Sequence, residues 1–137
     1  TGTTQAGLIC GQLLNKDDRR IVGISIARKN PKGRDVVIDS IRSYLKNSVT
    51  EEQIQDKTIF IDDYTVGYGK YNRNVLETIE YVLKNYGIPL DAIYTGKAFM
   101  GMERYIEDNQ IKGKNLLFIH TGGTPLFFDM LRKVAEV

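Results

Sequence analysis

Cysteine and histidine, which commonly build cross-links and metal centres, are nearly missing from this sequence. Its 137 residues include one cysteine, Cys10, one histidine, His120, and no tryptophan. A lone cysteine cannot form an internal disulfide, and a lone histidine brings no second imidazole to a metal ion. The sequence thus predicts no metal site and favours a reducing, cytoplasmic location.

Long apolar runs and an excess of one charge are missing as well. No stretch approaches the roughly 20 apolar residues of a membrane-spanning helix, and we expect no secretion signal. The 19 basic and 17 acidic side chains are spread along the chain and leave a formal net charge of +2. This balance gives no electrostatic footprint for nucleic acid. We therefore expect no nucleic acid and no membrane as partners.

The chain does contain apolar residues in two alternating spacings. Residues 5–15 place theirs on one helical face, and the continuous apolar run at 21–27 is typical of a buried strand. The alternation then recurs. Further helices are expected near 37–45, 74–86, 97–108 and 125–133, and further strands at 58–62, 92–94 and 116–120.

The helix expected near 74–86 has the most distinct ends. Asn74, with Glu77 three residues later, is typical of a capped helix start, and Gly87 followed by Pro89 is typical of a helix end. Four tyrosines fall on the expected helices and are predicted to pack there: Tyr44, Tyr81, Tyr86 and Tyr105.

Strands that are apolar throughout, and that alternate with helices, favour a parallel sheet covered on both faces. We therefore expect an α/β fold of three layers, in which a mostly parallel sheet has helices on both faces. The length suits one domain and is short for two ordinary ones. Residues 1–137 are thus expected to form a single domain.

Glycine-rich loops stand where such a sheet would bind a ligand. Ligands of parallel sheets gather outside the carboxyl ends of the strands, where loops lead into helix N-termini. Four loops at these places contain glycine with threonine or tyrosine, and we expect them to share one rim: residues 1–7 (TGTTQAG), 62–72 (DDYTVGYGKYN), 94–98 (YTGKA) and 120–123 (HTGG).

The opening loop, TGTTQAG, has the chemistry of an anion site. Glycine lets the backbone approach an anion, the positive end of the following helix attracts negative charge, and threonine hydroxyls add donors. The loop lacks the Gly-Lys-Ser/Thr of a nucleoside triphosphate site and the spacing of a dinucleotide site, which favours a monophosphate. A helix cap at a frayed end is an equally good interpretation of this loop taken alone.

The four loops together carry a family resemblance. The motifs TGTTQAGL, GYG, YTGKAFMGM and LLFIHTGG, in this order, resemble the D-cysteine desulfhydrase and 1-aminocyclopropane-1-carboxylate deaminase family. The resemblance covers nearly the whole chain, and its last two motifs are the most specific. It implies the tryptophan synthase β-like fold (fold type II), in which this chain would form part of the large domain that binds pyridoxal 5'-phosphate. It also implies a small amino-acid substrate and a homodimer as a candidate assembly.

The resemblance also implies roles for individual residues. Tyr68, in the GYG motif, would face the substrate, and Tyr94 would pack by the pyridine ring of the cofactor, so that both are candidate catalytic residues. The threonines of YTG and HTGG would lie near the ring nitrogen. The implied cofactor-binding residues are Thr1, Gly2, Thr3, Thr4, Tyr94, Thr95, Thr121 and Gly122.

Thr95 and Thr121 also bear on the substrate. In the family pattern, deaminases have Glu and Leu at these positions, whereas desulfhydrases have Thr at both. A neutral hydroxyl beside the pyridine nitrogen stabilises the protonated ring less than a carboxylate does. The pattern therefore favours β-elimination of a thiol, in which D-cysteine and water give pyruvate, sulfide and ammonia. The cyclopropane amino acid is the alternative substrate, and a phosphate-binding module without catalysis is an alternative of another class.

The family holds its cofactor on a lysine that precedes the phosphate loop, and the sequence shows no such region. Lys97 matches a different family lysine, so we expect it to be a surface or supporting residue. Residues 1–137 are then expected to be an incomplete domain, the C-terminal part of a larger pyridoxal-phosphate-dependent enzyme. We expect this part to be inactive without the missing N-terminal part.

Three further polar features are expected to be structural. His120 ends an apolar strand and is expected to make supporting hydrogen bonds. Cys10 lies on the buried face of the first helix, where it would act as a small apolar residue. Asp62 and Asp63 are adjacent on an extended segment and would point to opposite sides, so that one faces the rim and the other the solvent.

Overall fold

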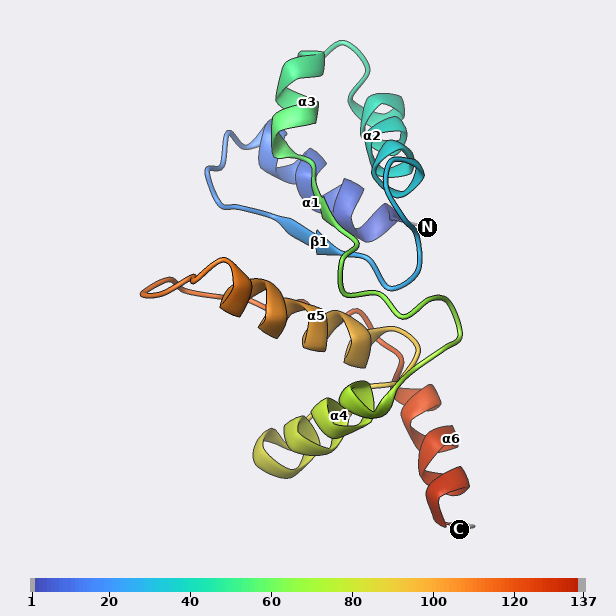
Figure 1. Ribbon diagram of the computed structural model, residues 1–137. Coiled ribbons are helices and arrows are strands. Elements are labelled where there is room, and N and C mark those ends of the chain that lie inside the picture. The colour runs from blue at the N-terminus through green and yellow to red at the C-terminus, as the bar shows by residue number, and fades with distance from the viewer. Residues whose placement is uncertain (1, 136–137) are drawn as a thin grey trace. The chain divides into compact units, whose positions relative to one another are not determined.

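The computed structural model describes residues 2–135, with side chains to residue 131. The chain divides into two compact units, Thr1–Asp63 and Tyr64–Val137, and each has its own apolar core. The first unit contains α1 (Thr3–Leu14), β1 (Val22–Ile24), α2 (Lys32–Leu45), α3 (Glu51–Lys57) and β2 (Ile59–Ile61) (Figure 1). The second contains α4 (Arg73–Tyr86), α5 (Thr95–Asp108) and α6 (Thr124–Ala135).

The first unit is built around two parallel strands. β1 pairs with β2 in a register that sets Val22 opposite Ile59 and Ile24 opposite Ile61. Parallel neighbours cannot be joined by a tight turn, and here α2 and α3 form the crossover between them. The α/β class with a parallel sheet is therefore confirmed, although the described residues contain two of the predicted strands rather than four.

Apolar residues at helical spacing form the core of the first unit. The predicted inner faces of α1 and α2 are confirmed except at Leu14 and Tyr44, and Ile54 of α3 joins them. Tyr44 is an exception, because its side chain is 71% exposed on α2 and does not pack as predicted. The buried residues of this core are Ala6, Ile9, Cys10, Val37, Ile38, Ile41, Leu45 and Ile54.

Helix α3 is one element that the apolar spacing did not predict. The Thr50 hydroxyl accepts a hydrogen bond from the Gln53 backbone N–H, and the Gln53 side chain accepts one from the Thr50 N–H. This reciprocal capping box offsets the cost of starting a helix of only 7 residues. The Thr-x-x-Gln pattern was the available signal.

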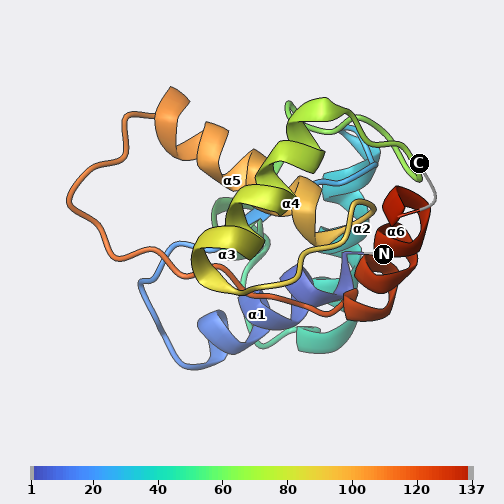
Figure 2. The ribbon, with the colours of Figure 1, turned by 90° about the horizontal axis from the view of Figure 1, so that it is seen from below.

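The second unit packs α4 against α5 (Figure 2). The core of this unit also includes Phe127 of α6. The helix predicted near 74–86 is present and ends at Gly87 as expected, but its N-cap is Asn72 and not Asn74. The Asn72 side chain accepts from the Val75 N–H, so the helix begins at Arg73. Tyr105 packs as predicted, whereas Tyr81 and Tyr86 are exposed.

Two predicted strands of the second unit are wrong. Residues 92–94 form a turn, and residues 116–120 have no regular secondary structure. A strand forms only where a neighbour pairs with its N–H and C=O groups, and no strand among the described residues pairs with 116–120. Leu116, Leu117 and Ile119 are accordingly exposed.

The prediction that residues 1–137 form a single domain stays a prediction.

Among the helices described, none has the length and apolar character needed to cross a bilayer. The longest of them have 14 residues, and each carries charged side chains.

Replacement of Ile41 tests the core of the first unit. Ile41 is 0% exposed on α2, and we expect Ile41→Ala to lower the free energy of unfolding by about 2–5 kcal/mol through lost burial and a cavity. The matched change Tyr44→Ala on the same helix should cost no more than about 0.5 kcal/mol, because Tyr44 is exposed. Urea unfolding followed by circular dichroism measures both. Equal losses for the two variants would contradict this description of the core.

Candidate functional site

Two tyrosines predicted to be catalytic lie side by side in the second unit. The hydroxyl oxygens of Tyr68 and Tyr94 are 3.2 Å apart, within hydrogen-bond distance. Their rings meet edge to face, with centroids 6.3 Å apart and an angle of 65° between the planes. The residues are 26 positions apart in the sequence, on different loops. The structure thus joins residues that the sequence could nominate only separately.

The contact between the tyrosines changes the acidity of one of them. The hydrogen bond with Tyr68 raises the pKa of Tyr94 above its ordinary value of 10, and the nearby charge of Asp91 adds to the effect. Tyr94 therefore keeps its proton at neutral pH. One of the two hydroxyls donates its hydrogen to the other. The hydroxyl that accepts this bond still has its own hydrogen to donate to a ligand.

Tyr94 is held in place by a buried carboxylate that the sequence analysis missed. Asp91 is 0% exposed, and one of its oxygens accepts from the backbone N–H groups of Ile93 (2.8 Å) and Tyr94 (2.7 Å). The other oxygen accepts from the N–H of Thr95 at 2.9 Å. Asp91 thus satisfies the free N–H groups at the start of α5. The signal in the sequence was an Asp shortly before a helix, which is a common capping arrangement.

Hydrogen bonds also determine the ionisation of Asp91. Burial alone would raise its pKa, but bonds from the Thr95 hydroxyl and from the backbone of residues 93–95 outweigh burial and lower it. The carboxylate is therefore charged at neutral pH. Its charge lies at the positive end of α5, which is a favourable position for an anion.

Thr95, predicted to lie near the ring nitrogen, is the first residue of α5 and is 2% exposed. Its hydroxyl donates to the Asp91 carboxylate at 2.7 Å and accepts from the Asp91 N–H at 2.9 Å. A hydroxyl has one hydrogen to donate. In this arrangement Thr95 can accept from a ligand N–H, but it cannot donate to a bare ring nitrogen.

Lys97 is buried, so its expected place at the surface is wrong. The side chain is 1% exposed, and its ammonium group donates to the backbone carbonyl of Gly67 at 2.8 Å. Burial lowers the pKa of Lys97, and the negative charge of Asp91 opposes that shift. Its expected supporting role agrees with this bond, since Gly67 directly precedes Tyr68.

The HTGG loop approaches the same carboxylate. A Cβ atom on Gly123 would lie 2.2 Å from an Asp91 oxygen, and Gly123 has a positive φ of 92°, so this position requires glycine. Thr121 and Gly122 are exposed beside it. His120 makes the expected supporting bonds: its Nδ1 accepts from the Gly122 N–H at 3.3 Å, and its Nε2 lies 3.0 Å from the Pro89 carbonyl.

The predicted phosphate loop becomes the N-terminus of α1, in the first unit. Thr1 lies outside the described residues, Gly2 is the N-cap, and Thr3 and Thr4 form the exposed first turn. Gly2 has a left-handed φ of 83°, and a Cβ there would lie 2.8 Å from a methyl group of Val37. Because glycine has no side chain, the N-cap residue makes no side-chain hydrogen bond to the backbone N–H groups at the start of α1.

The predicted site residues therefore fall into two groups. Tyr68, Tyr94 and Thr95 are linked in the second unit by bonds that involve Asp91 and Lys97, and the HTGG loop meets the same carboxylate. The N-terminus of α1 belongs to the first unit. The predicted common rim of all four loops stays a prediction.

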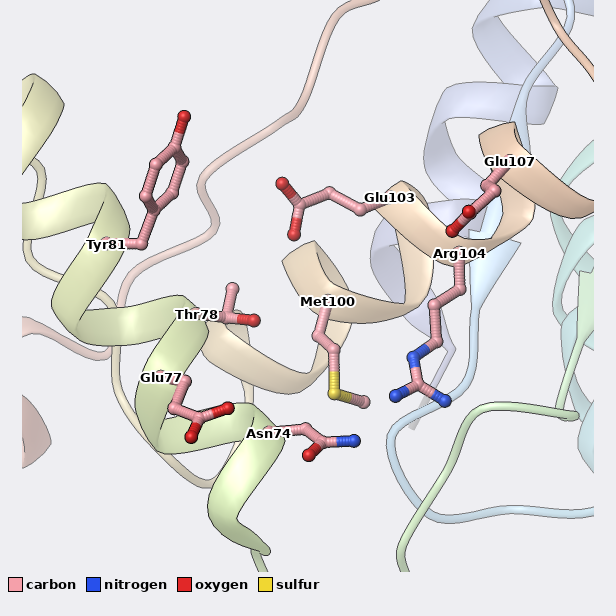
Figure 3. A pocket seen from close by; sticks show the side chains of 8 residues that line it. All are labelled: Asn74, Glu77, Thr78, Tyr81, Met100, Glu103, Arg104 and Glu107. Carbon is pink, nitrogen blue, oxygen red and sulfur yellow. The ribbon is translucent and has the colours of Figure 1, made fainter.

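A surface groove lies between α4 and α5 in the second unit (Figure 3). It is open, half of its lining residues are charged, and burial raises the pKa of Glu103 within it. It contains none of the predicted site residues. Its lining consists of Asn74, Glu77, Thr78, Tyr81, Met100, Glu103, Arg104 and Glu107.

The remaining polar candidates of the first unit have structural partners. Asp62 accepts from the Asn30 side chain at 2.7 Å and from the Asn30 N–H at 3.1 Å, and these bonds lower its pKa. Asp63 is exposed, as expected for one of the two carboxylates, and the expectation that Asp62 faces the rim stays a prediction. Cys10 is buried in the core, and burial raises the pKa of its thiol.

Replacement of Asp91 tests this network. At neutral pH we expect Asp91→Asn to lower the free energy of unfolding by about 1–3 kcal/mol, because an amide cannot accept all the bonds that the carboxylate accepts. The folded-state pKa of Asp91 is depressed, so its contribution is complete above the ordinary value of 3.8 and is lost as the pH falls through the folded value.

The difference between parent and Asp91→Asn should therefore shrink below pH 3.8, as measured by urea unfolding at a series of pH values. The exposed Asp108→Asn is the control, because Asp108 bonds only outside this network, to the Tyr64 hydroxyl. A difference that stayed constant with pH would contradict the role given to the Asp91 charge.

Comparison with known proteins gives the relatives of this chain, although no family model matches it. It is 31% identical over 135 residues to a D-cysteine desulfhydrase of Serratia proteamaculans and 33% identical over 128 residues to one of Yersinia enterocolitica. Each match covers 91% of this chain and 38% of the relative. The chain thus spans about two fifths of the length of the curated relatives that it matches.

A solved structure gives the same result for the fold. The crystal structure of a homologue of ACC deaminase (1-aminocyclopropane-1-carboxylate deaminase) matches 98% of this chain and 41% of its own chain, with a TM-score of 0.78 and 31% sequence identity. Sequence and fold therefore agree, and over nearly its whole length the chain is homologous to part of proteins named 1-aminocyclopropane-1-carboxylate deaminase and D-cysteine desulfhydrase.

Proposed function

We propose that this chain supplies part of the pyridoxal 5'-phosphate site of an amino-acid lyase, and that the lyase acts on D-cysteine. The single observation that carries the proposal is the meeting of the Tyr68 and Tyr94 hydroxyls, 3.2 Å apart on two motifs of the family resemblance. Identity of 31–33% to two D-cysteine desulfhydrases and of 31–32% to two putative 1-aminocyclopropane-1-carboxylate deaminases supports the lyase, and it does not favour either substrate. The intact enzyme would combine this part with the further length that the relatives have.

The residues present fit a phosphate and an aromatic ring. The first turn of α1 offers backbone N–H groups and the positive end of a helix, beside the exposed threonines Thr3 and Thr4. Tyr94 is partly exposed and offers a ring face to a planar group. Lys97 does not serve as the amine that holds the cofactor in this arrangement, because it is buried on the Gly67 carbonyl.

The tyrosine pair would handle protons at the substrate. Pyridoxal phosphate, when bound, supplies an electron sink for the electrons of the broken Cα–H bond. Tyr94 keeps its proton because its pKa is raised, so it can donate a hydrogen bond or a proton. Since Tyr68 and Tyr94 share a hydrogen bond, a proton taken up at one oxygen can be matched by one released at the other.

The two threonines support the desulfhydrase reaction. The structure assigns the hydroxyl hydrogen of Thr95 to Asp91, so the exposed Thr121 is the candidate donor to a ring nitrogen. Neither residue carries a charge, and the ring would be a milder electron sink than one paired with a carboxylate. This suits elimination of a thiolate, which is a good leaving group, to give pyruvate, sulfide and ammonia from D-cysteine and water.

Ring opening of the cyclopropane amino acid is the second candidate function. The match to the structure of an ACC deaminase homologue, at 31% identity over nearly the whole chain, favours it. Its products would be 2-oxobutyrate and ammonia, so sulfide and 2-oxobutyrate distinguish the candidates.

Product analysis of the intact protein tests the proposed substrate. With D-cysteine we expect sulfide, and with the cyclopropane amino acid we expect little 2-oxobutyrate, both followed by colorimetric assay. Tyr68→Phe should lower kcat by about 100-fold or more, because general acid–base residues typically contribute that much. Tyr71→Phe, in the same loop segment, is the matched control and should retain activity. Abundant 2-oxobutyrate without sulfide would overturn the assignment of D-cysteine.

The 137-residue chain on its own provides a separate test. We expect it to bind pyridoxal 5'-phosphate weakly and to turn over neither amino acid. The reason is that Lys97, the lysine of the YTGKA motif, is held by the Gly67 carbonyl and does not serve as the amine that holds the cofactor. Visible absorbance of the mixture, before and after borohydride treatment, measures covalent binding. A visible band that borohydride removes would contradict this expectation.

A further inference from the structure

The position of Tyr68 requires an explanation, because its own packing does not provide one. Its side chain is 70% exposed, so burial cannot hold it against Tyr94. The residue lies in the loop between β2 and α4, outside any helix or strand. Exposed aromatic side chains on loops sample several rotamers unless the loop itself is anchored. The anchor of this loop therefore determines whether the two hydroxyls meet.

Lys97 anchors the loop at Gly67 from the first turn of α5, and the Tyr64 hydroxyl, which donates to Asp108 at 2.7 Å, holds the start of the same loop. Its ammonium group reaches the carbonyl of Gly67, one residue before Tyr68 and 30 positions away in the sequence. A buried ammonium group is costly unless it is hydrogen-bonded and its charge is balanced. The Gly67 carbonyl accepts one of its hydrogens, and the Asp91 carboxylate supplies opposite charge nearby.

The same turn of α5 also holds the other tyrosine. Asp91 accepts from the N–H of Tyr94 at 2.7 Å, and Tyr94 immediately precedes α5. One helix start thus carries both attachments, since Asp91 holds the Tyr94 backbone and Lys97 holds the loop of Tyr68. The distance between the hydroxyls depends on the two attachments together.

We propose that Lys97 is a positioning residue, which holds the Tyr68 loop through the Gly67 carbonyl and so keeps the Tyr68 hydroxyl on that of Tyr94. The inference rests on the proposed function, in which this pair handles protons. Lys97 touches neither substrate nor reacting atoms in this role.

Lys97→Met in the intact protein tests the tether, because methionine keeps much of the apolar length and loses the donor. We expect kcat with D-cysteine to fall by about 10–100-fold, as for misplacement of a catalytic group by about 1 Å, with a smaller change in KM. Lys97→Arg retains a donor and should recover part of the loss. Lys84→Met is the matched control, because Lys84 is an exposed lysine of α4 in the same unit, and it should leave kcat unchanged.

A second readout is independent of activity. Nuclear magnetic resonance of ring-labelled tyrosine, assigned with Tyr68→Phe and Tyr94→Phe, follows the titration of each phenol. In the parent protein Tyr94 should titrate above the ordinary value of 10, because Tyr68 is its partner. Lys97→Met should move that titration toward 10, and Lys84→Met should not. Lys97→Gln, which keeps a shorter donor, serves in place of Lys97→Met if the latter does not fold.

The outcomes separate the two proposals. If a folded Lys97→Met protein keeps both the parental Tyr94 titration and the parental kcat, Lys97 is a packing residue and the tether is overturned. If no variant turns over either amino acid while the Tyr94 titration still responds to Lys97, the tether stands and the proposed function fails.

Discussion

The buried carboxylate of Asp91 is the interaction on which the second unit depends. It has no exposed surface and accepts hydrogen bonds from three successive N–H groups at the start of α5, and from the Thr95 hydroxyl. Each of those groups would otherwise be left without a partner inside the protein, which is costly. Gly123 approaches Oδ2 of Asp91 so closely that a larger residue could not be accommodated. One anion therefore determines where α5 begins and where the HTGG loop lies.

The chemistry proposed for the chain follows from that arrangement. Tyr94 precedes α5 and Lys97 lies in its first turn, so the helix start places one tyrosine directly and reaches the loop of the other. Neither tyrosine is buried, which leaves their hydroxyls accessible to a ligand. Rigid attachment below an exposed pair of polar groups is what a catalytic site requires, since loose groups lose rate through misorientation.

The network also changes how the threonine of the YTG motif is understood. Sequence patterns treat Thr and Glu at this position as alternative partners of a ring nitrogen. Here the Thr95 hydroxyl is part of the cap of α5, bonded to Asp91 on both its donor and its acceptor side. A glutamate at position 95 would bring a second carboxylate beside Asp91 and would raise the pKa of one of them. In this chain, an exchange of Thr95 for glutamate would thus also change the stability of this helix start.

Local sequence determined much of this protein. The spacing of apolar residues predicted α1, α2, α4, α5 and α6, because each helix forms where one face can be buried. Continuous apolar runs predicted β1 and β2, and the family motifs nominated Tyr68 and Tyr94 individually. The misplaced N-cap, Asn74 for Asn72, shows that two nearby asparagines cannot be separated by pattern alone.

Tertiary structure decided the rest, for reasons that act over long sequence separations. Residues 116–120 have the composition of a strand but no described strand pairs with them, because a strand depends on a neighbour and not on its own side chains. The sequence left open whether Lys97 is a surface or a supporting residue, and its bond to Gly67, 30 positions away, decides for the supporting one. The sequence by itself nominated the residues that are proposed to carry the chemistry of the family. Only the folded chain determined that Asp91 and Lys97 hold two of them together, since hydrogen bonds between distant segments leave no periodic signal in a sequence.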